Sequence, residues 1–182
     1  MSLCPRRSPW WLALLAFALA LFIDFAPWPA CAQTFVGTQN YDNGRSGADT
    51  TEMALTPATV NQTTFGKLFT ITGLDANVNG QILYVPGVTI GGVRHNVLYA
   101  FQTNNSDNSP SGLAAFDADS GAPLWRDSST DASPIIPPSA EYSTAAPVID
   151  PATGTMYVLT KNDTDDTGQT RIHAIDITTG ME

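Results

Sequence analysis

A turn between two short apolar segments occurs twice in this chain and constrains its fold more than any other feature. In the first copy, the apolar residues 113–116 lead into a turn at 117–121, and Trp125 lies on the return segment. In such turns Asp and Ser side chains bond the nearby backbone, and Gly takes the position with positive φ. Residues 176–180 repeat the pattern 59 residues later. A repeat of this length, built from short strands, predicts a propeller or a similar array. The positions that define the repeat are Phe116, Asp117, Gly121 and Trp125 in the first copy, and Ile175, Asp176 and Gly180 in the second.

Residues 1–32 have the pattern of a secretory signal peptide. A basic start at Arg6 and Arg7 precedes 14 continuous apolar residues at 10–23, and a small-x-small site ends just before Gln33. A retained anchor would need roughly 20 apolar residues to span a membrane. A lipid-modified Cys31 and a twin-arginine signal are the alternatives, although the flanking residues fit neither pattern well. We therefore expect a secreted or periplasmic protein with no membrane span after cleavage.

Composition excludes several kinds of chemistry and partner. Both cysteines, Cys4 and Cys31, lie in the predicted signal peptide, so the mature chain would have no disulfide, catalytic thiol or Cys-ligated metal. The formal charge of −9 argues against nucleic acid and against anionic membrane surfaces as partners. With 14 Gly, 13 Pro and only 14% charged residues, the chain has the composition of a turn-rich all-β protein.

The mature chain divides into a strap at 33–64 and a repeat region at 65–182. The strap is polar, with a turn expected at Asn43-Gly44 and one helical turn at 56–61, capped by Thr56. Residues 65–70 resemble the segment around Trp125 and are expected to form an orphan outer strand. The predicted strands are 81–90, 96–103, 113–117 and 123–126 in the first unit, and 145–149, 155–161 and 171–177 in the second.

Each unit is thus a sheet of about 58 residues that needs neighbours on both faces. Trp125, a large ring at a strand end, is expected to pack between adjacent sheets. The predicted fold is an all-β propeller of four-stranded blades, present as about two blades and an orphan closing strand. Because a complete ring has roughly 4 to 8 blades, the chain is expected to be the N-terminal part of a longer protein.

The same residues carry a resemblance to a known family. Residues 113–125 and 171–180 resemble the pyrroloquinoline-quinone-type propeller repeat, Tyr-Ala-Phe-Asp-x-x-Thr-Gly-x-x-x-Trp. From about Tyr41 onward the chain is similar to secreted bacterial proteins that carry such repeats. The matching segments are 45–48, 55–61, 65–69, 83–85, 95–97 and 147–154.

This resemblance implies a quinoprotein-like propeller and leaves two functions open. One is a non-catalytic exported scaffold or interaction module, with a protein or a glycan bound on a loop-lined propeller face and the remaining blades of a longer chain as neighbours. The alternative is the N-terminal piece of a quinone- or calcium-dependent dehydrogenase acting on an alcohol or sugar. Quinoprotein dehydrogenases use vicinal cysteines and a Glu, Asn and Asp set around calcium. The mature chain lacks the cysteines, so pyrroloquinoline quinone and calcium enter by family analogy alone, and no cofactor is expected for this chain by itself.

The remaining candidates for site residues are few. Asp163, Asp165 and Asp166 alternate before a Gly as in a calcium loop, but the twelfth position is Ala174 instead of Glu, so a solvated hairpin loop is favoured. His95 is expected beside a turn and His173 within a strand. We expect no Ser or Asp to be placed for a triad with either histidine, so both are interpreted as structural and no catalytic residue is assigned.

Overall fold

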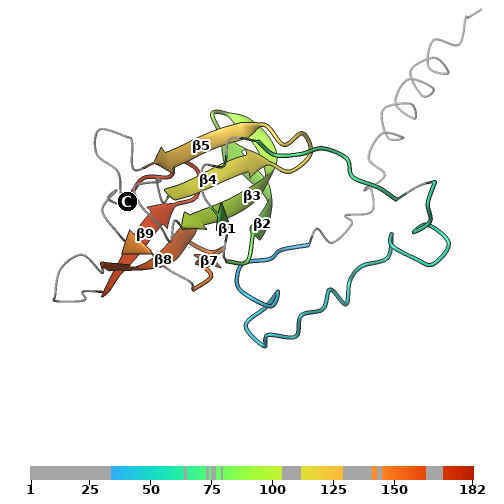
Figure 1. The fold of residues 1–182 in the computed structure, drawn as a ribbon, viewed down its shortest axis with the longest axis horizontal. Helices are drawn as coiled ribbons and strands as arrows, with labels where there is room; N and C mark the ends of the chain where they lie inside the picture. Colours follow the sequence, from blue (N-terminus) through green and yellow to red (C-terminus); the bar gives the residue numbers. More distant parts are fainter. Residues whose placement is uncertain are drawn as a thin grey trace, which may run out of the picture. The chain divides into compact units, whose positions relative to one another are not determined.

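The computed structural model describes residues 34–63, 65–72, 74, 77–78, 80–103, 112–128, 141–142, 145–162 and 170–182. Residues 34–182 form one compact unit. The predicted signal peptide lies outside the described residues. Within them the chain is all-β: it has no helix, and its nine strands form two antiparallel sheets (Figure 1).

The first sheet, sheet A, is an antiparallel meander. Its strands are β1 (Asn77–Val78), β2 (Leu83–Ile90), β3 (Val93–Thr103), β4 (Gly112–Asp117) and β5 (Pro123–Ser128). Strands β1 and β2 pair with the same edge of β3, and β4 and β5 follow on its other side. A bulge interrupts β2 between Val85 and Val88. It is centred on Pro86 and Gly87, a pair suited to bulges because Pro lacks an N–H and Gly here has a φ of 68°.

The second sheet, sheet B, repeats this meander without a fourth long strand. Its strands are β6 (Glu141–Tyr142), β7 (Val148–Asp150), β8 (Thr155–Asn162) and β9 (Thr170–Asp176). Strands β6 and β7 pair with one edge of β8, and β9 pairs with the other. Since β1 and β6 have only two residues each, the longer strands number four in sheet A and three in sheet B.

The two sheets are equivalent residue by residue. Tyr99 of β3 lies between Leu83 and Ala115, and Tyr157 of β8 lies in the same way between Val148 and Ala174. The predicted strands are therefore confirmed with small changes at their ends. The largest changes are of three residues: β3 begins at Val93 and not at Asn96, and β7 begins at Val148 and not at Ala145.

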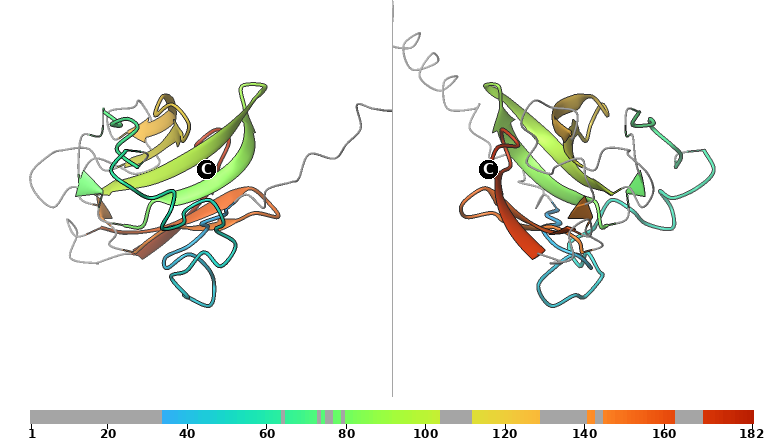
Figure 2. Two further views of the ribbon diagram at one scale, coloured as in Figure 1. Left: turned by 90° about the vertical axis from the view of Figure 1, so that its right-hand side faces the viewer. Right: turned by 60° about the vertical axis from the view of Figure 1, so that its left-hand side comes forward.

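The main core lies between the two sheets, which face each other (Figure 2). Side chains of alternating residues on each sheet point into it, as a period of two requires. Each fully buried aliphatic side chain contributes about 1.5–3 kcal/mol to stability. Sheet A supplies Leu83, Val85, Val97, Tyr99, Phe101, Leu113 and Ala115, and sheet B supplies Ile149, Met156, Val158 and Ile175, with Ile177 just beyond its last strand.

The other face of sheet A is covered by the segment that precedes it. Ala100, Ala114 and Phe116 are buried there against Ile71 and Leu74 of that segment and against Val78 of β1 in the same sheet. Sheet A is therefore buried on both faces, a pattern that requires small or apolar side chains at successive positions of β4, where all residues from Gly112 to Phe116 are buried.

The strap links the two sheets at their edges. Val36 and Tyr84 exchange two backbone hydrogen bonds of 2.9 and 3.0 Å, and the next carbonyl, of Gly37, accepts a bond of 2.8 Å from the Ile149 amide. The strap thus contacts β2 of sheet A and β7 of sheet B at consecutive residues. Further along, the expected turns are confirmed: the Arg45 amide bonds the Asp42 carbonyl, and the Val60 amide bonds the Thr56 carbonyl.

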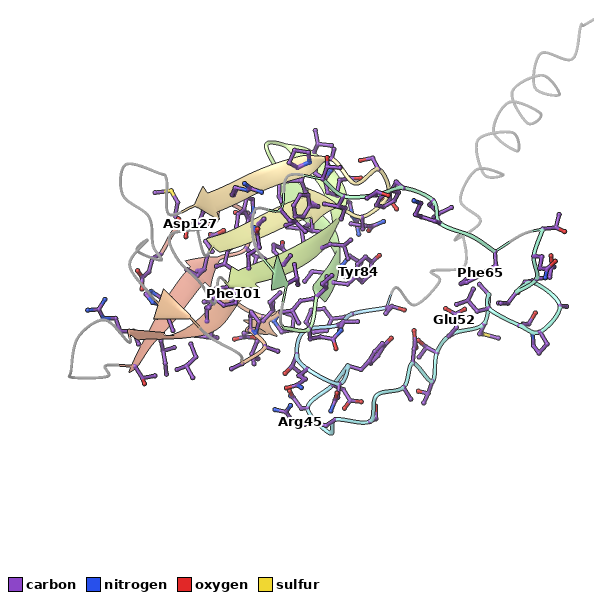
Figure 3. All side chains as sticks on the ribbon, in the orientation of Figure 1. Arg45, Glu52, Phe65, Tyr84, Phe101 and Asp127 are labelled. Atoms are coloured by element: carbon purple, nitrogen blue, oxygen red, sulfur yellow. The ribbon has the colours of Figure 1, made fainter. Side chains whose placement is uncertain are left out.

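The expectation of an outer strand at 65–70 is wrong. The described residues of this segment are not in a strand, and Phe65 and Leu68 are exposed (Figure 3). A strand needs a neighbouring strand to satisfy its backbone hydrogen-bonding groups. No strand comes before this segment among the described residues, so it has no earlier strands with which to form a blade. Its last aromatic residue, Phe69, nevertheless has a structural contact, described below.

Candidate functional site

The repeated turns have the same bonds from backbone amides in both units. The Asp117 carboxylate accepts bonds from the Ser120 amide (2.8 Å) and hydroxyl (2.7 Å), and the Asp117 carbonyl accepts one from the Gly121 amide (2.7 Å). In the second unit the Asp176 carboxylate accepts a bond of 3.1 Å from the Thr179 amide, and its carbonyl accepts one of 2.8 Å from the Gly180 amide. Gly121 and Gly180 have φ values of 76° and 73°, which confirms the positive φ predicted for them.

The two Asp side chains are held as anions by these turns. Hydrogen bonds from the Ser120 hydroxyl, and then from His95, lower the pKa of Asp117 to about 2. The Thr178 hydroxyl and amide lower the pKa of Asp176 in the same manner. Both carboxylates therefore serve the turns, as their equivalent positions in the repeat predicted.

Trp125 connects the two sheets. Its indole N–H donates to the carbonyl of Ile177 at 2.9 Å, and the Tyr99 hydroxyl donates to the same oxygen at 3.0 Å. The two rings lie 5.8 Å apart at 45°, within the range of favourable aromatic pairs. Burial, with the nearby charge of Asp176, raises the pKa of Tyr99 and keeps its hydroxyl protonated as a donor.

The Trp125 ring also lies directly on Gly180, and the same contact occurs one unit earlier. A Cβ added to Gly180 would lie 2.6 Å from the Trp125 ring, and one added to Gly121 would lie 2.7 Å from the Phe69 ring. The number of residues between the ring and the glycine that it covers is nearly the same for Phe69 and Gly121 as for Trp125 and Gly180. In each case an aromatic ring from the preceding part of the chain thus packs against the turn glycine of a unit, which explains why Gly is required there beyond its backbone conformation.

The equivalent apolar positions Phe116 and Ile175 occupy the same face of their respective sheets. Phe116 is buried on the face of sheet A that contacts Ile71, and Ile175 is buried on the face of sheet B that contacts sheet A. In each unit, therefore, this face packs against the part of the chain that precedes the unit in sequence.

The His95 imidazole and the Asp117 carboxylate form a pair that the sequence analysis missed. Their Nδ1 and Oδ2 atoms are 2.7 Å apart, because Val97 pairs with Asp117 across β3 and β4 and so brings residue 95 to the turn. The expectation concerned a Ser or Asp placed for a triad with a histidine, and this pair brings an Asp next to His95. Ser120, however, donates to Asp117 and not to the imidazole, so these groups lack the Ser–His bond of a nucleophilic triad.

Polar side chains next to this pair also bond within the fold. The Asn96 amide donates to Asp119 at 3.0 Å, and its oxygen accepts a bond of 3.2 Å from the Gly87 amide in the β2 bulge. The group at this end of sheet A therefore links the bulge in β2 to the turn after β4.

His173 is buried on the face of sheet B that contacts sheet A. Its Nε2 lies 2.9 Å from the Thr160 hydroxyl, and its Nδ1 lies 3.2 Å from the Glu182 carboxylate. Both ring nitrogens thus have polar neighbours, as a buried imidazole requires.

The calcium-loop candidates Asp163, Asp165 and Asp166 lie outside the described residues. Among the residues that are described, no group of three or more His, Cys, Asp or Glu side chains could hold a metal ion. The same residues contain no helix long and apolar enough to cross a membrane.

No family model, curated protein or solved structure matches this chain.

Proposed function

We propose that the chain is an exported, non-catalytic scaffold made of consecutive blades of an incomplete β-propeller. The observation that carries the proposal is the contact of Phe69 with Gly121 and of Trp125 with Gly180. Trp125 of the first unit lies on the turn glycine of the second, and Phe69 of the preceding segment lies in the same way on the turn glycine of the first, which supports one repeated relation along the chain. Repeats related in this way form arrays or rings.

The register supports the same relation between units. Every paired position of β3 and β4 from Val97 to Gln102 has a counterpart in β8 and β9. The resemblance to quinone-type repeats agrees with this arrangement, and about two units would form part of a larger ring. The formal charge of −9 and the polar turns then suit a loop-lined face that binds a protein or a glycan.

The polar groups that catalysis would use are engaged in structure. Asp117, Asp176 and Asn96 hold turns, and His95 bonds Asp117. A scaffold needs no activated nucleophile or open metal site, and the geometry of the described residues is accounted for without one.

An activity and export assay tests this function. The full gene product is expressed with its own N-terminus, and the mature protein is isolated from the periplasm or medium and sequenced from its N-terminus. We expect export with cleavage before Gln33, and no oxidation of alcohols or sugars with pyrroloquinoline quinone, calcium and an electron acceptor. Turnover of any such substrate would support the dehydrogenase alternative and overturn the scaffold function.

A further inference from the structure

The face of sheet B directed away from sheet A carries a continuous group of exposed apolar side chains. Val148 pairs with Tyr157, and Leu159 pairs with Ile172, so the group crosses all three long strands. Their exposed fractions are 42%, 42%, 41% and 71%. A contiguous apolar surface on a sheet marks an interaction site or an aggregation hazard. We call this group, with Ala174 beside Tyr157, the outer face of sheet B.

Sheet A has an equivalent face in which the same positions are covered. Leu83 pairs with Tyr99, and Phe101 pairs with Leu113, in the register of the four residues above. Their exposed fractions are 0%, 1%, 2% and 0%. Ala115 corresponds to Ala174, and each is a small residue paired with the tyrosine of its own sheet, Tyr99 or Tyr157. The two faces thus have apolar side chains at equivalent positions and differ in exposure: those of sheet A are buried, and those of sheet B are exposed.

The chain itself shows which partner such a face accepts. The face of sheet A is covered by sheet B, whose aliphatic residues Met156, Val158 and Ile175 fill the core between them. Two polar contacts link the sheets at one atom: the Tyr99 hydroxyl and the Trp125 indole N–H both donate to the Ile177 carbonyl, at 3.0 and 2.9 Å. The partner is therefore a sheet with an aliphatic face and a free carbonyl in the turn after its last strand.

We propose that the outer face of sheet B is the docking surface for a third sheet of this same repeat. That sheet supplies an aliphatic face like that of sheet B and a turn carbonyl in the position of the Ile177 oxygen, which accepts a hydrogen bond from Tyr157. The inference rests on the proposed function in one respect: successive units must pack against one another in the same way. It requires neither a closed ring nor the absence of catalysis.

Extending the chain by one unit tests this surface. Because Gly121 and Gly180 are equivalent, residues 122–182 are joined after Gly180 of the full chain, which keeps the repeat in phase and adds a fourth strand and a new sheet. In a background with Cys4→Ser and Cys31→Ser, Ile172→Cys in the original unit reports coverage through its rate of maleimide labelling. Thr89→Cys, on an exposed position of β2, is the matched control.

We expect Ile172→Cys to be labelled at least about tenfold more slowly in the extended chain, because labelling then requires local opening. Thr89→Cys should be labelled at equal rates in both chains. Tyr157→Phe should lower the melting temperature of the extended chain and leave that of the original chain unchanged. Equal labelling rates of Ile172→Cys in both chains would overturn the proposal. An extended chain that does not fold would also overturn it, because the proposal requires the outer face of sheet B to bind the added sheet.

A second copy of the chain is the competing occupant. If the original chain is dimeric by light scattering and Ile172→Cys becomes reactive only on dilution, the outer face of sheet B serves self-association and the proposal is wrong. Slow labelling in the extended chain, found together with dehydrogenase activity, would overturn the scaffold function and leave the docking surface supported.

Discussion

Gly180 and Gly154 share a backbone conformation but differ in what surrounds them. Their φ values are 73° and 67°. A Cβ would lie 2.6 Å from the Trp125 ring at Gly180, whereas at Gly154 the nearest atom, in Ile177, is 3.8 Å away. The pair therefore separates the cost of backbone strain from the cost of displacing the ring that joins the two units.

We predict that Gly180→Ala destabilises the fold more than Gly154→Ala does. The backbone strain alone costs roughly 1–2 kcal/mol at either position, and displacing Trp125 adds about 1–3 kcal/mol at Gly180, the usual cost of overpacking. Urea unfolding at pH 7 measures both. Equal losses of unfolding free energy would show that the Trp125 contact contributes nothing. Gly121→Ala, beneath Phe69, should behave like Gly180→Ala.

The lowered pKa of Asp117 predicts how stability depends on pH. Its folded-state pKa of about 2 lies below the unfolded value of about 3.9. The ionised carboxylate therefore stabilises the folded state fully above about pH 4, and this contribution is lost as the pH falls toward 2. Asp117→Asn should reduce the unfolding free energy by roughly 1 kcal/mol at pH 7.

The difference between wild type and Asp117→Asn should shrink as the pH falls from 5 to 2.5, measured by urea unfolding at each pH. Asp119→Asn, which removes a charge from the same turn, is the matched control. A difference for Asp117→Asn that stays constant over this range would contradict the assignment of its carboxylate to the turn.

Among the elements, the strap contributes more to holding the fold together than its sequence suggests. It is polar, yet Val36 and Gly37 hold β2 and β7 through backbone bonds. We predict that Val36→Pro, which removes the N–H donated to Tyr84, speeds hydrogen exchange at the Tyr84 and Ile149 amides by about tenfold or more. Thr50→Pro, at an exposed strap position, should leave both rates unchanged. Equal protection in Val36→Pro would mean that the strap does not hold the two edges.

The strands and turns could be predicted because their signals are local. Alternating residues, or for β4 a continuous apolar run, place β2 to β5 and β7 to β9, and Asp with Gly specifies each turn. The segment at 65–70 was wrongly predicted because a strand also depends on a neighbour, which similarity to the region of Trp125 cannot supply. The bond between Gly37 and Ile149 could not be predicted, since backbone bonds leave no mark on side-chain type.

The polar pair of the candidate site was missed for a related reason. His95 and Asp117 are 22 residues apart in sequence, and only the register of β3 against β4 brings them together. The two-residue repeat indicates which face a residue occupies and does not fix which residues of adjacent strands oppose each other. With the register known, the pair follows directly.

For the whole molecule, the exposed outer face of sheet B predicts poor solubility. We expect purified residues 33–182 to bind a hydrophobic dye and to precipitate readily, and Ile172→Lys to reduce both effects without loss of secondary structure. Ile175→Lys is the matched control: it places the same charge three residues away on the buried face, at a side chain with 0% exposure, and should unfold the protein. A soluble monomer with a sharp, reversible thermal transition would contradict the expected hazard.

The link between Gly37 and Ile149 also sets an order of events during synthesis. The two residues are 112 positions apart, so at about 5–20 residues per second the Gly37 carbonyl is made roughly 6–22 s before the amide that it will bond. Contacts that close such long loops form slowly. Sheet A and the bond between Val36 and Tyr84 need only residues that precede β7, so the bond from Ile149 to Gly37 closes its long loop on elements whose residues have already been made.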